Sequence, residues 1–119
     1  MRTDWVYRRG DIYFANLNPY CGSEQGGARP VVVLQNNTAN KFSPTLIVAV
    51  ITTRNINEKQ IPTHCRLYRN KVLKKDSVVA LEQIKTIDKK RIRKFLGKMN
   101  EKEMKLIDHF LLKSIGIQK

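Results

Sequence analysis

Two long apolar runs rich in β-branched residues constrain the fold of this chain more than any other feature. Residues 30–35 form a continuous run, which is typical of a strand buried on both faces, and Thr45–Thr53 forms a second one. Shorter segments complete the strand pattern, at residues 11–17, 63–67, 77–81 and 84–87. Residues 36–44 and 54–60 predict turn-rich or polar connections. Because no helical pattern separates the strands, the sequence favours a small antiparallel barrel or sandwich over parallel βαβ units.

The pattern changes towards the C-terminus, where helical periodicity replaces the strand pattern. Asp88 predicts a cap for one short turn over residues 89–91, and residues 95–96 predict a short edge strand. Asn100 followed by Glu103 is a capping-box signature at the start of a helix. The helix then presents a mainly apolar stripe and a glycine stop, made of Met104, Ile107, Phe110, Leu111, Ser114 and Gly116. We expect the stripe to pack on the sheet, which makes the fold class mainly β with a C-terminal helix (α+β).

Length and charge indicate one domain with a polyanionic partner. The 119 residues are expected to form a single domain, residues 1–119, large enough for one hydrophobic core. Lys and Arg number 23 against 10 Asp and Glu, and the net charge of +13 favours RNA, DNA or an acidic protein. Two basic clusters, residues 66–75 and 85–98, are candidates for tracking a nucleic-acid backbone, although either also fits a solvated face.

Composition also narrows the compartment and the cofactor chemistry. No apolar run approaches the roughly 20 residues of a membrane span, and the N-terminus lacks the apolar core of a signal peptide. We therefore expect a cytoplasmic protein with no membrane partner. Cys21 and Cys65 are far apart in the sequence, and only 2 histidines are present. We expect free thiols, no metal site and no cofactor.

Residues 22–30, which read Gly-Ser-Glu-Gln-Gly-Gly-Ala-Arg-Pro, carry the strongest functional signal. Their glycines allow backbone N–H groups to approach a ligand closely. Pro30 biases Arg29 towards an extended conformation, so that Arg29 stands at the start of a strand beneath a mobile loop. A guanidinium held in this way suits a phosphate group. The alternative is an ordinary hairpin loop with a solvated Arg.

Familiar signatures of other enzyme classes are absent from the sequence. There is no Walker A loop, H-E-x-x-H motif, G-x-S-x-G motif or pair of carboxylates at helical spacing. His64 and His109 are each expected to be structural or surface residues, which disfavours a two-histidine ribonuclease. RNA can nevertheless be cleaved by its own ribose 2′-OH, provided that the protein holds the phosphate in line and stabilises charge. Arg29 and Thr52, each at one end of a long apolar strand, are our candidates for that role.

Several further motifs occur in order along the chain. They are Arg-Gly-Asp-Ile-Tyr-Phe-Ala-Asn-Leu-Asn-Pro at residues 9–19, Gln35-Asn36, Phe-Ser-Pro-Thr at 42–45, Ile51-Thr52, Pro-Thr-His at 62–64, and Asp-Ser-Val at 76–78 running through Leu-Glu-Gln-Ile at 81–84 to Thr-Ile-Asp at 86–88. Together with the glycine loop, these motifs closely resemble the MazF/PemK family of type II toxins, which are mRNA interferases. The resemblance covers residues 9–88 and continues weakly into the C-terminal helix.

The resemblance implies an SH3-like small antiparallel β-barrel and a homodimeric endoribonuclease that cleaves single-stranded RNA at short sequences without a metal. It implies that Arg29 and Thr52 are the catalytic residues. The further RNA-binding residues that it implies are Ser23, Glu24, Gln25, Asn36, Glu82 and Gln83. An acidic, MazE-like antitoxin is the expected partner, and it would compete with RNA because both are anionic.

Two other function classes fit parts of the sequence. A toxin of the same barrel architecture could poison a protein target such as DNA gyrase, and it would not need Arg29 together with Thr52. A non-catalytic nucleic-acid-binding module would need the charge alone. The general base is unassigned because Arg keeps its proton at neutral pH, and Glu24 is a candidate on chemistry alone. Tyr20-Cys21 departs from the family pattern and bears on which bases are accepted.

Overall fold

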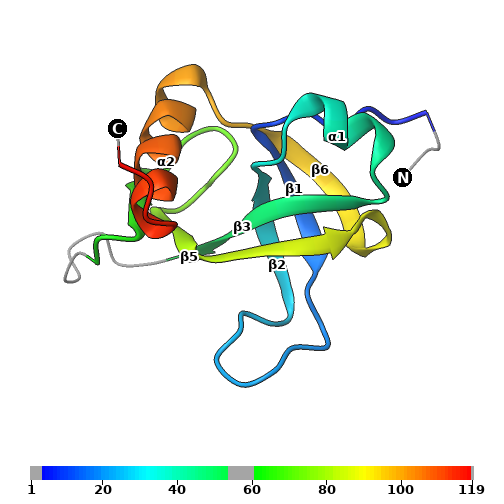
Figure 1. Cartoon of the computed structure of the whole chain (residues 1–119), viewed down its shortest axis with the longest axis horizontal. Coiled ribbons are helices and arrows are strands. Elements are labelled where there is room, and N and C mark those ends of the chain that lie inside the picture. The colour runs from blue at the N-terminus through cyan, green and yellow to red at the C-terminus, as the bar shows by residue number, and fades with distance from the viewer. Residues whose placement is uncertain (1–3, 54–60, 119) are drawn as a thin grey trace.

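Six strands form one antiparallel sheet in the order β4-β5-β3-β2-β1-β6 in the computed structural model, which describes residues 4–53 and 61–118 (Figure 1). The strands are β1 (Asp11–Asn16), β2 (Ala28–Val33), β3 (Thr45–Thr53), β4 (His64–Leu67), β5 (Ser77–Asp88) and β6 (Ile92–Lys98). Two α-helices, α1 (Asn37–Phe42) and α2 (Glu101–Ser114), and a 3-10 turn over Lys89–Arg91 complete the described elements. The fold class predicted from the sequence, mainly antiparallel β with a C-terminal helix, is confirmed.

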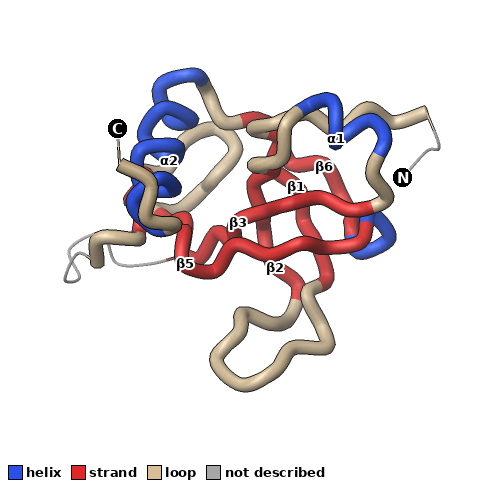
Figure 2. Tube along the Cα trace, viewed as in Figure 1, coloured by secondary structure: helices blue, strands red, loops and turns tan. Residues whose placement is uncertain are grey.

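The sheet is strongly curled, so that β3 and β5 cross β1, β2 and β6 in the view of Figures 1 and 2. Strands β4 and β6 stand at the two ends of the strand order and do not pair with each other in the described part of the chain. The architecture is therefore a curled, partly open barrel. The long loop between β1 and β2 projects away from the sheet at the bottom of Figure 2.

Both faces of the central strands are buried, as the continuous apolar runs predict. Val32 of β2 belongs to one core cluster, whereas Val31 and Val33 belong to a second cluster on the other face. In β3, Ala49 joins the first cluster and Val50 joins the second. The strands that carry the two long runs thus form the shared wall between two apolar layers.

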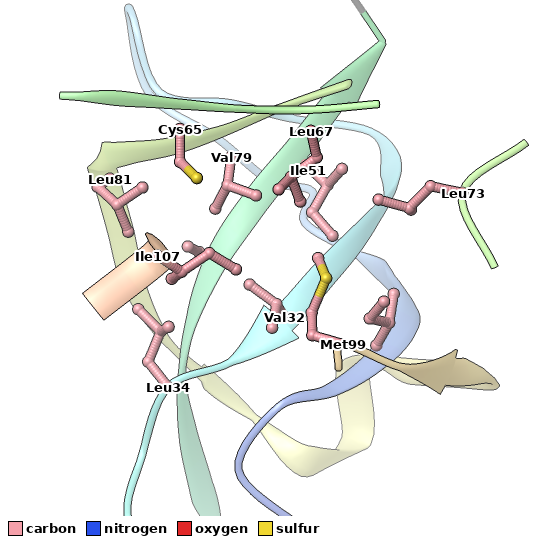
Figure 3. Packing of buried hydrophobic residues seen from close by; sticks show 12 residues of the cluster. Val32, Leu34, Ile51, Cys65, Leu67, Leu73, Val79, Leu81, Met99 and Ile107 are labelled. Carbon is pink, nitrogen blue, oxygen red and sulfur yellow. The ribbon is translucent and has the colours of Figure 1, made fainter. Parts of the chain in front are cut away.

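Helix α2 covers the first of these layers. Ile107 is fully buried and extends from α2 into the group that contains Val32 and Val79 (Figure 3). At the end of the helix, the Ser114 hydroxyl donates to the carbonyl oxygen of Leu81 in β5 at 2.7 Å. The predicted packing of the apolar stripe on the sheet is confirmed. No helix in the described residues is long and apolar enough to cross a membrane.

The predicted helix boundaries follow from local capping. The Asn100 side chain accepts from the Glu103 backbone N–H at 2.7 Å, and the Glu103 carboxylate accepts from the Asn100 N–H at 2.9 Å, which completes the capping box. Gly116 adopts a φ of +80° just beyond α2, a conformation that favours glycine. Asp88 caps the 3-10 turn by accepting from the Lys90 N–H at 2.8 Å.

Two elements differ from the sequence prediction. Residues 77–81 and 84–87 belong to the single strand β5, which contains a bulge between the two predicted segments. Residues 36–44 contain α1, although they were expected to form turns. The helix forms because the Asn36 side chain caps it by accepting from the Ala39 N–H at 2.9 Å, and because the buried Asn40 amide is hydrogen-bonded to Gln35. The predicted loop 54–60 lies outside the described residues.

Both cysteines are free thiols, as expected. Cys21 is exposed in the loop between β1 and β2, whereas Cys65 is buried in the first core cluster. Burial, with a smaller contribution from the charge of Glu103, raises the pKa of the Cys65 thiol to about 12. The Cys65 side chain is therefore a neutral apolar packing group.

We predict that the Ile107→Ala substitution lowers the free energy of unfolding by about 2–5 kcal/mol, because it leaves a cavity between α2 and the sheet. Chemical denaturation followed by circular dichroism measures this change. Leu106→Ala is the matched control, since Leu106 lies next to Ile107 on α2 but is 42% exposed. Equal losses of stability in the two variants would contradict the packing of α2 described above.

Candidate active site

The end of the β2–β3 ladder brings Arg29 and Thr52 together. The ladder pairs Val31 with Val50, and the same register carried along both strands aligns Arg29 with Thr52. Because side chains alternate along a strand, Arg29 and Thr52 share the face of Val31 and Val50. This face is opposite to the one that α2 covers. The two predicted catalytic residues are therefore neighbours in the fold.

Arg29 and Thr52 line a single cavity of about 460 Å³. Lys74 and Lys75, from the basic cluster 66–75, also line it. The Nε atom of Arg29 donates to the carbonyl oxygen of Gly26 at 2.8 Å, which leaves the two terminal nitrogens for a ligand. Within residues 4–53 and 61–118, no carboxylate forms an ion pair with this guanidinium. The cavity therefore concentrates positive charge in a form that suits a phosphate group.

A second cavity of about 300 Å³ adjoins the first, and Thr52 lines both. The loop and strand residues that line the second cavity with Thr52 are Ser23, Gln25, Ile61, His64, Val78, Ala80, Glu82 and Gln83. Four of the six predicted RNA-binding residues, Ser23, Gln25, Glu82 and Gln83, are thus gathered beside Thr52. The structure places a polar, hydrogen-bonding surface next to the basic cavity.

The bulge in β5 explains how Glu82 and Gln83 reach the second cavity. Val50 of β3 pairs with Ala80, but the preceding Ala49 pairs with Ile84, so the intervening residues of β5 leave the ladder. A bulge re-aims the side chains that it contains, and bulges are common beside active sites. This irregularity also accounts for the break in the strand pattern of the sequence.

Internal hydrogen bonds organise the glycine loop. The Gly27 N–H donates to the Asn18 side-chain oxygen at 2.9 Å, and the Leu17 N–H donates to the Gly27 carbonyl at 2.9 Å. Nearer the tip, the Glu24 carboxylate accepts from the Cys21 N–H at 2.7 Å. These hydrogen bonds connect residues within the loop, and Ser23 and Gln25 lie at the second cavity.

His64 and Glu82 form a hydrogen-bonded pair at the second cavity. His64 Nε2 lies 2.8 Å from Glu82 Oε2, and the Thr63 hydroxyl donates to the same carboxylate at 3.1 Å. Burial raises the pKa of Glu82, but the hydrogen bonds from His64, from the Glu82 backbone and from Thr63, with the His64 charge, outweigh it and lower the pKa below its ordinary value. Glu82 is therefore a carboxylate at neutral pH, able to orient the imidazole of His64.

The sequence predicted a structural or surface role for His64 and gave no indication that His64 lies beside Thr52. Strand pairing brings it there, because His64 of β4 pairs with Ala80 of β5, which in turn pairs with Val50. This register puts His64 on the same face as Thr52. The Pro62-Thr63-His64 segment stands out in the sequence, but its position beside Thr52 depends on the pairing of β4 with β5 and of β5 with β3.

Two of the predicted RNA-binding residues lie outside both cavities. Glu24 is exposed, and its carboxylate is engaged by the Cys21 N–H. Asn36 caps α1 through its side chain. In this structure Glu24 stabilises the loop between β1 and β2, and Asn36 stabilises the start of α1. Among the described residues, no group of three or more His, Cys, Asp or Glu side chains is arranged to hold a metal ion.

The Thr52 hydroxyl is the unsatisfied polar group of the site. Its Oγ1 atom is buried and has no hydrogen-bond partner among the residues that the structure describes. A buried hydroxyl without a partner is costly, so such atoms often mark functional positions. Rotation of the side chain towards the cavities would let Oγ1 donate to a ligand held by Arg29.

We predict that Glu82→Gln destabilises the protein at pH 7 by less than about 1 kcal/mol, because 39% of the Glu82 side chain is exposed and its ion pair is screened. A lowered pKa in the folded state stabilises the fold above the pKa of the unfolded chain, and this contribution is lost as the pH falls through the folded-state pKa. The difference from wild type should therefore close towards pH 3. Urea denaturation of both proteins at pH 7 and pH 3 measures it, with the exposed Glu101→Gln as control. A difference that widens in acid would contradict the assignment.

Comparisons with known proteins agree with this geometry. The model of the family described as PemK-like, MazF-like toxin of type II toxin-antitoxin system matches residues 8–115. MazF from Deinococcus radiodurans is similar in structure, with a TM-score of 0.81 and 23% identity over 96% of this chain and 100% of that chain. An endoribonuclease from a mycobacterial species has a TM-score of 0.79 and 21% identity over 99% of each chain. A mycobacterial endoribonuclease in complex with its cognate antitoxin has a TM-score of 0.75 and 22% identity over 96% of this chain and 97% of that chain. The chain therefore belongs to the PemK-like, MazF-like toxins of type II toxin-antitoxin systems.

Proposed function

We propose that this toxin is a sequence-specific endoribonuclease that cleaves single-stranded mRNA without a metal and without the ribosome. The observation that carries the proposal is the shared cavity of Arg29 and Thr52, which lies within a basic surface. Similar structures are named as endoribonucleases, which supports the same activity here. A DNA-gyrase poison or a passive binding module would have no need of this pairing.

The reaction that fits the site is internal attack of RNA on its own backbone. The ribose 2′ oxygen forms a bond to the adjacent phosphorus while the bond to the 5′ oxygen breaks. The products are a 2′,3′-cyclic phosphate and a 5′-OH end. The terminal nitrogens of Arg29 bind the non-bridging oxygens and stabilise the charge that builds on them, and Thr52 adds a directed hydrogen bond.

Proton transfer is the step that Arg29 cannot perform, because a guanidinium keeps its proton at neutral pH. We assign this step to His64, whose Nε2 is engaged by Glu82. Its Nδ1 has no hydrogen-bond partner in the described part of the chain, and it can accept the proton of the attacking 2′-OH. The leaving 5′ oxygen takes a proton from solvent. Glu82 orients the imidazole and stabilises its protonated form, as a carboxylate does for a histidine base in other enzymes.

Sequence selectivity is assigned to the polar side chains around the second cavity. Ser23, Gln25 and Gln83 present hydroxyl and amide groups that can bind the edges of unpaired bases. Unpaired bases expose their full hydrogen-bonding edges, so a cavity beside the scissile phosphate can distinguish them. This arrangement supports cleavage at short recognition sequences.

We also propose that the active form is a homodimer in the cytoplasm and that an acidic, MazE-like antitoxin inhibits it. One similar structure is an endoribonuclease bound to its cognate antitoxin, and another is a MazE-MazF complex. The net charge of +13 suits an acidic peptide as well as RNA. RNA and antitoxin should therefore compete for the same basic surface.

We predict that purified protein cuts a long single-stranded RNA at discrete sites in the presence of EDTA, and that Arg29→Ala and Thr52→Val each lower the cleavage rate by about 100-fold or more. Mapping of the product ends should show cyclic phosphate and 5′-OH groups. Arg8→Ala and Thr86→Val are matched controls, because Arg8 and Thr86 are exposed and line neither cavity. Intact RNA with antitoxin-free protein, or cuts that persist unchanged in both active-site variants, would count against the proposed reaction.

We predict that His64→Gln lowers the cleavage rate by about 100-fold, the usual contribution of a general base. His109→Gln is the control, since His109 is exposed on α2. Cleavage by His64→Gln at the wild-type rate would remove His64 from the proton-transfer step.

A further inference from the structure

Tyr20 is an exposed aromatic residue in the loop that also carries Ser23 and Gln25. Its side chain is 57% exposed. Other aromatic residues near the N-terminus are held in the core: Trp5 donates to the Tyr13 hydroxyl at 2.8 Å and packs against Phe95, with 5.4 Å between ring centroids. Trp5 is therefore an anchor, and the ring of Tyr20 is the one exposed on the loop beside the candidate site.

The Tyr20 ring lies directly over Gly26. A Cβ atom added to Gly26 would be only 2.0 Å from Tyr20 Cδ1 and 2.5 Å from Cγ, so only glycine allows the ring to lie there without a shift. One side of the ring is thus seated on the backbone of the loop. The exposure of Tyr20 leaves much of the remaining ring surface open to solvent.

Gly26 also connects the ring to the catalytic cavity. The carbonyl oxygen of Gly26 accepts the hydrogen bond from Arg29 Nε at 2.8 Å. The ring of Tyr20 and the guanidinium of Arg29 are therefore held by the same peptide segment. A phosphate bound by Arg29 would have its neighbouring nucleotides close to this loop.

We propose that the exposed ring of Tyr20 is a stacking platform for one unpaired nucleobase that flanks the phosphate bound by Arg29. The site takes a planar base, because an aromatic ring seated on glycine offers a flat apolar surface and the adjacent cation binds the backbone of the same strand. Stacking accepts every base to some degree, so Tyr20 contributes affinity and orientation, while the polar groups of the second cavity discriminate among bases. This inference rests on the proposed RNA-cleaving function.

The test uses RNA that contains one mapped cleavage site and carries a 2′-deoxy nucleotide at that site, which prevents the attack and isolates binding from cleavage. The fluorescent base 2-aminopurine is placed in turn at each of the flanking positions. Stacking on Tyr20 should quench its fluorescence at one position. Tyr20→Phe should preserve the quenching, whereas Tyr20→Ala should abolish it and weaken binding by about tenfold. Tyr68→Ala is the control, because Tyr68 is 73% exposed but lines neither cavity.

An abasic RNA provides the decisive comparison. If the base stacks on Tyr20, removal of that base should weaken binding to wild type by about tenfold and leave binding to Tyr20→Ala almost unchanged, because the two changes remove the same interaction. Equal losses in both proteins at every flanking position would overturn the proposal. Cleavage of unmodified RNA by the wild type is measured in parallel. Absence of cleavage would count against the proposed function, whereas intact cleavage without a Tyr20-dependent base would count against the stacking site alone.

Gly26→Ala tests whether the seat of the ring matters. The added methyl group must displace the ring, so Gly26→Ala should also abolish the 2-aminopurine quenching. In the Tyr20→Ala background the same substitution should cause a smaller further loss of binding. Retention of the quenching in Gly26→Ala would show that the ring does not stack from the position described here and would contradict the proposal.

Discussion

The pairing of β2 with β3 is the constraint on which the fold and the site both depend. The ladder that pairs Val31 with Val50 also aligns Arg29 with Thr52 at its end. Because side chains alternate along strands, a shift of one residue would turn one of these two side chains to the opposite face. Such a shift would also move each buried valine from one apolar layer to the other. Packing of the two layers therefore sets the register, and the register brings Arg29 and Thr52 to one cavity.

Packing and the candidate site lie at different parts of the sheet. Helix α2 buries Ile107 against one face and ties its end to β5 through Ser114. The cavities of Arg29 and Thr52 lie at the ends of β2 and β3, where apolar residues of the α2 layer, such as Ile51 and Leu73, line the first cavity beside the polar groups. Apolar packing thus supports the sheet, and irregular segments carry the polar groups of the candidate site. The bulge of β5 is one such segment, since it turns Glu82 out of the ladder.

Electrostatics links the site to its ligands. Arg29 is held by the neutral carbonyl of Gly26, so its charge is not cancelled. Glu82, by contrast, is matched with His64, which keeps the carboxylate ionised and the imidazole oriented. The excess of positive charge suits polyanionic partners in general. The exposed ring of Tyr20 would add an apolar contact that salt screens little.

The amino-acid sequence alone determined the strands and helix ends that depend on a regular apolar pattern or on contacts between residues close in the chain. The apolar runs of β2 and β3 and the capping box of Asn100 were predicted correctly from the sequence, because the spacing of apolar residues and helix capping depend on residues near one another. Tertiary structure alone decided the rest. Helix α1 receives long-range hydrogen bonds from the Arg9 N–H to the Asn37 side chain and from Lys89 to the Asn40 carbonyl oxygen. His64 lies beside Thr52 because β4, β5 and β3 are neighbouring strands. These contacts join distant parts of the chain, and their free energy exists only after the strands have paired.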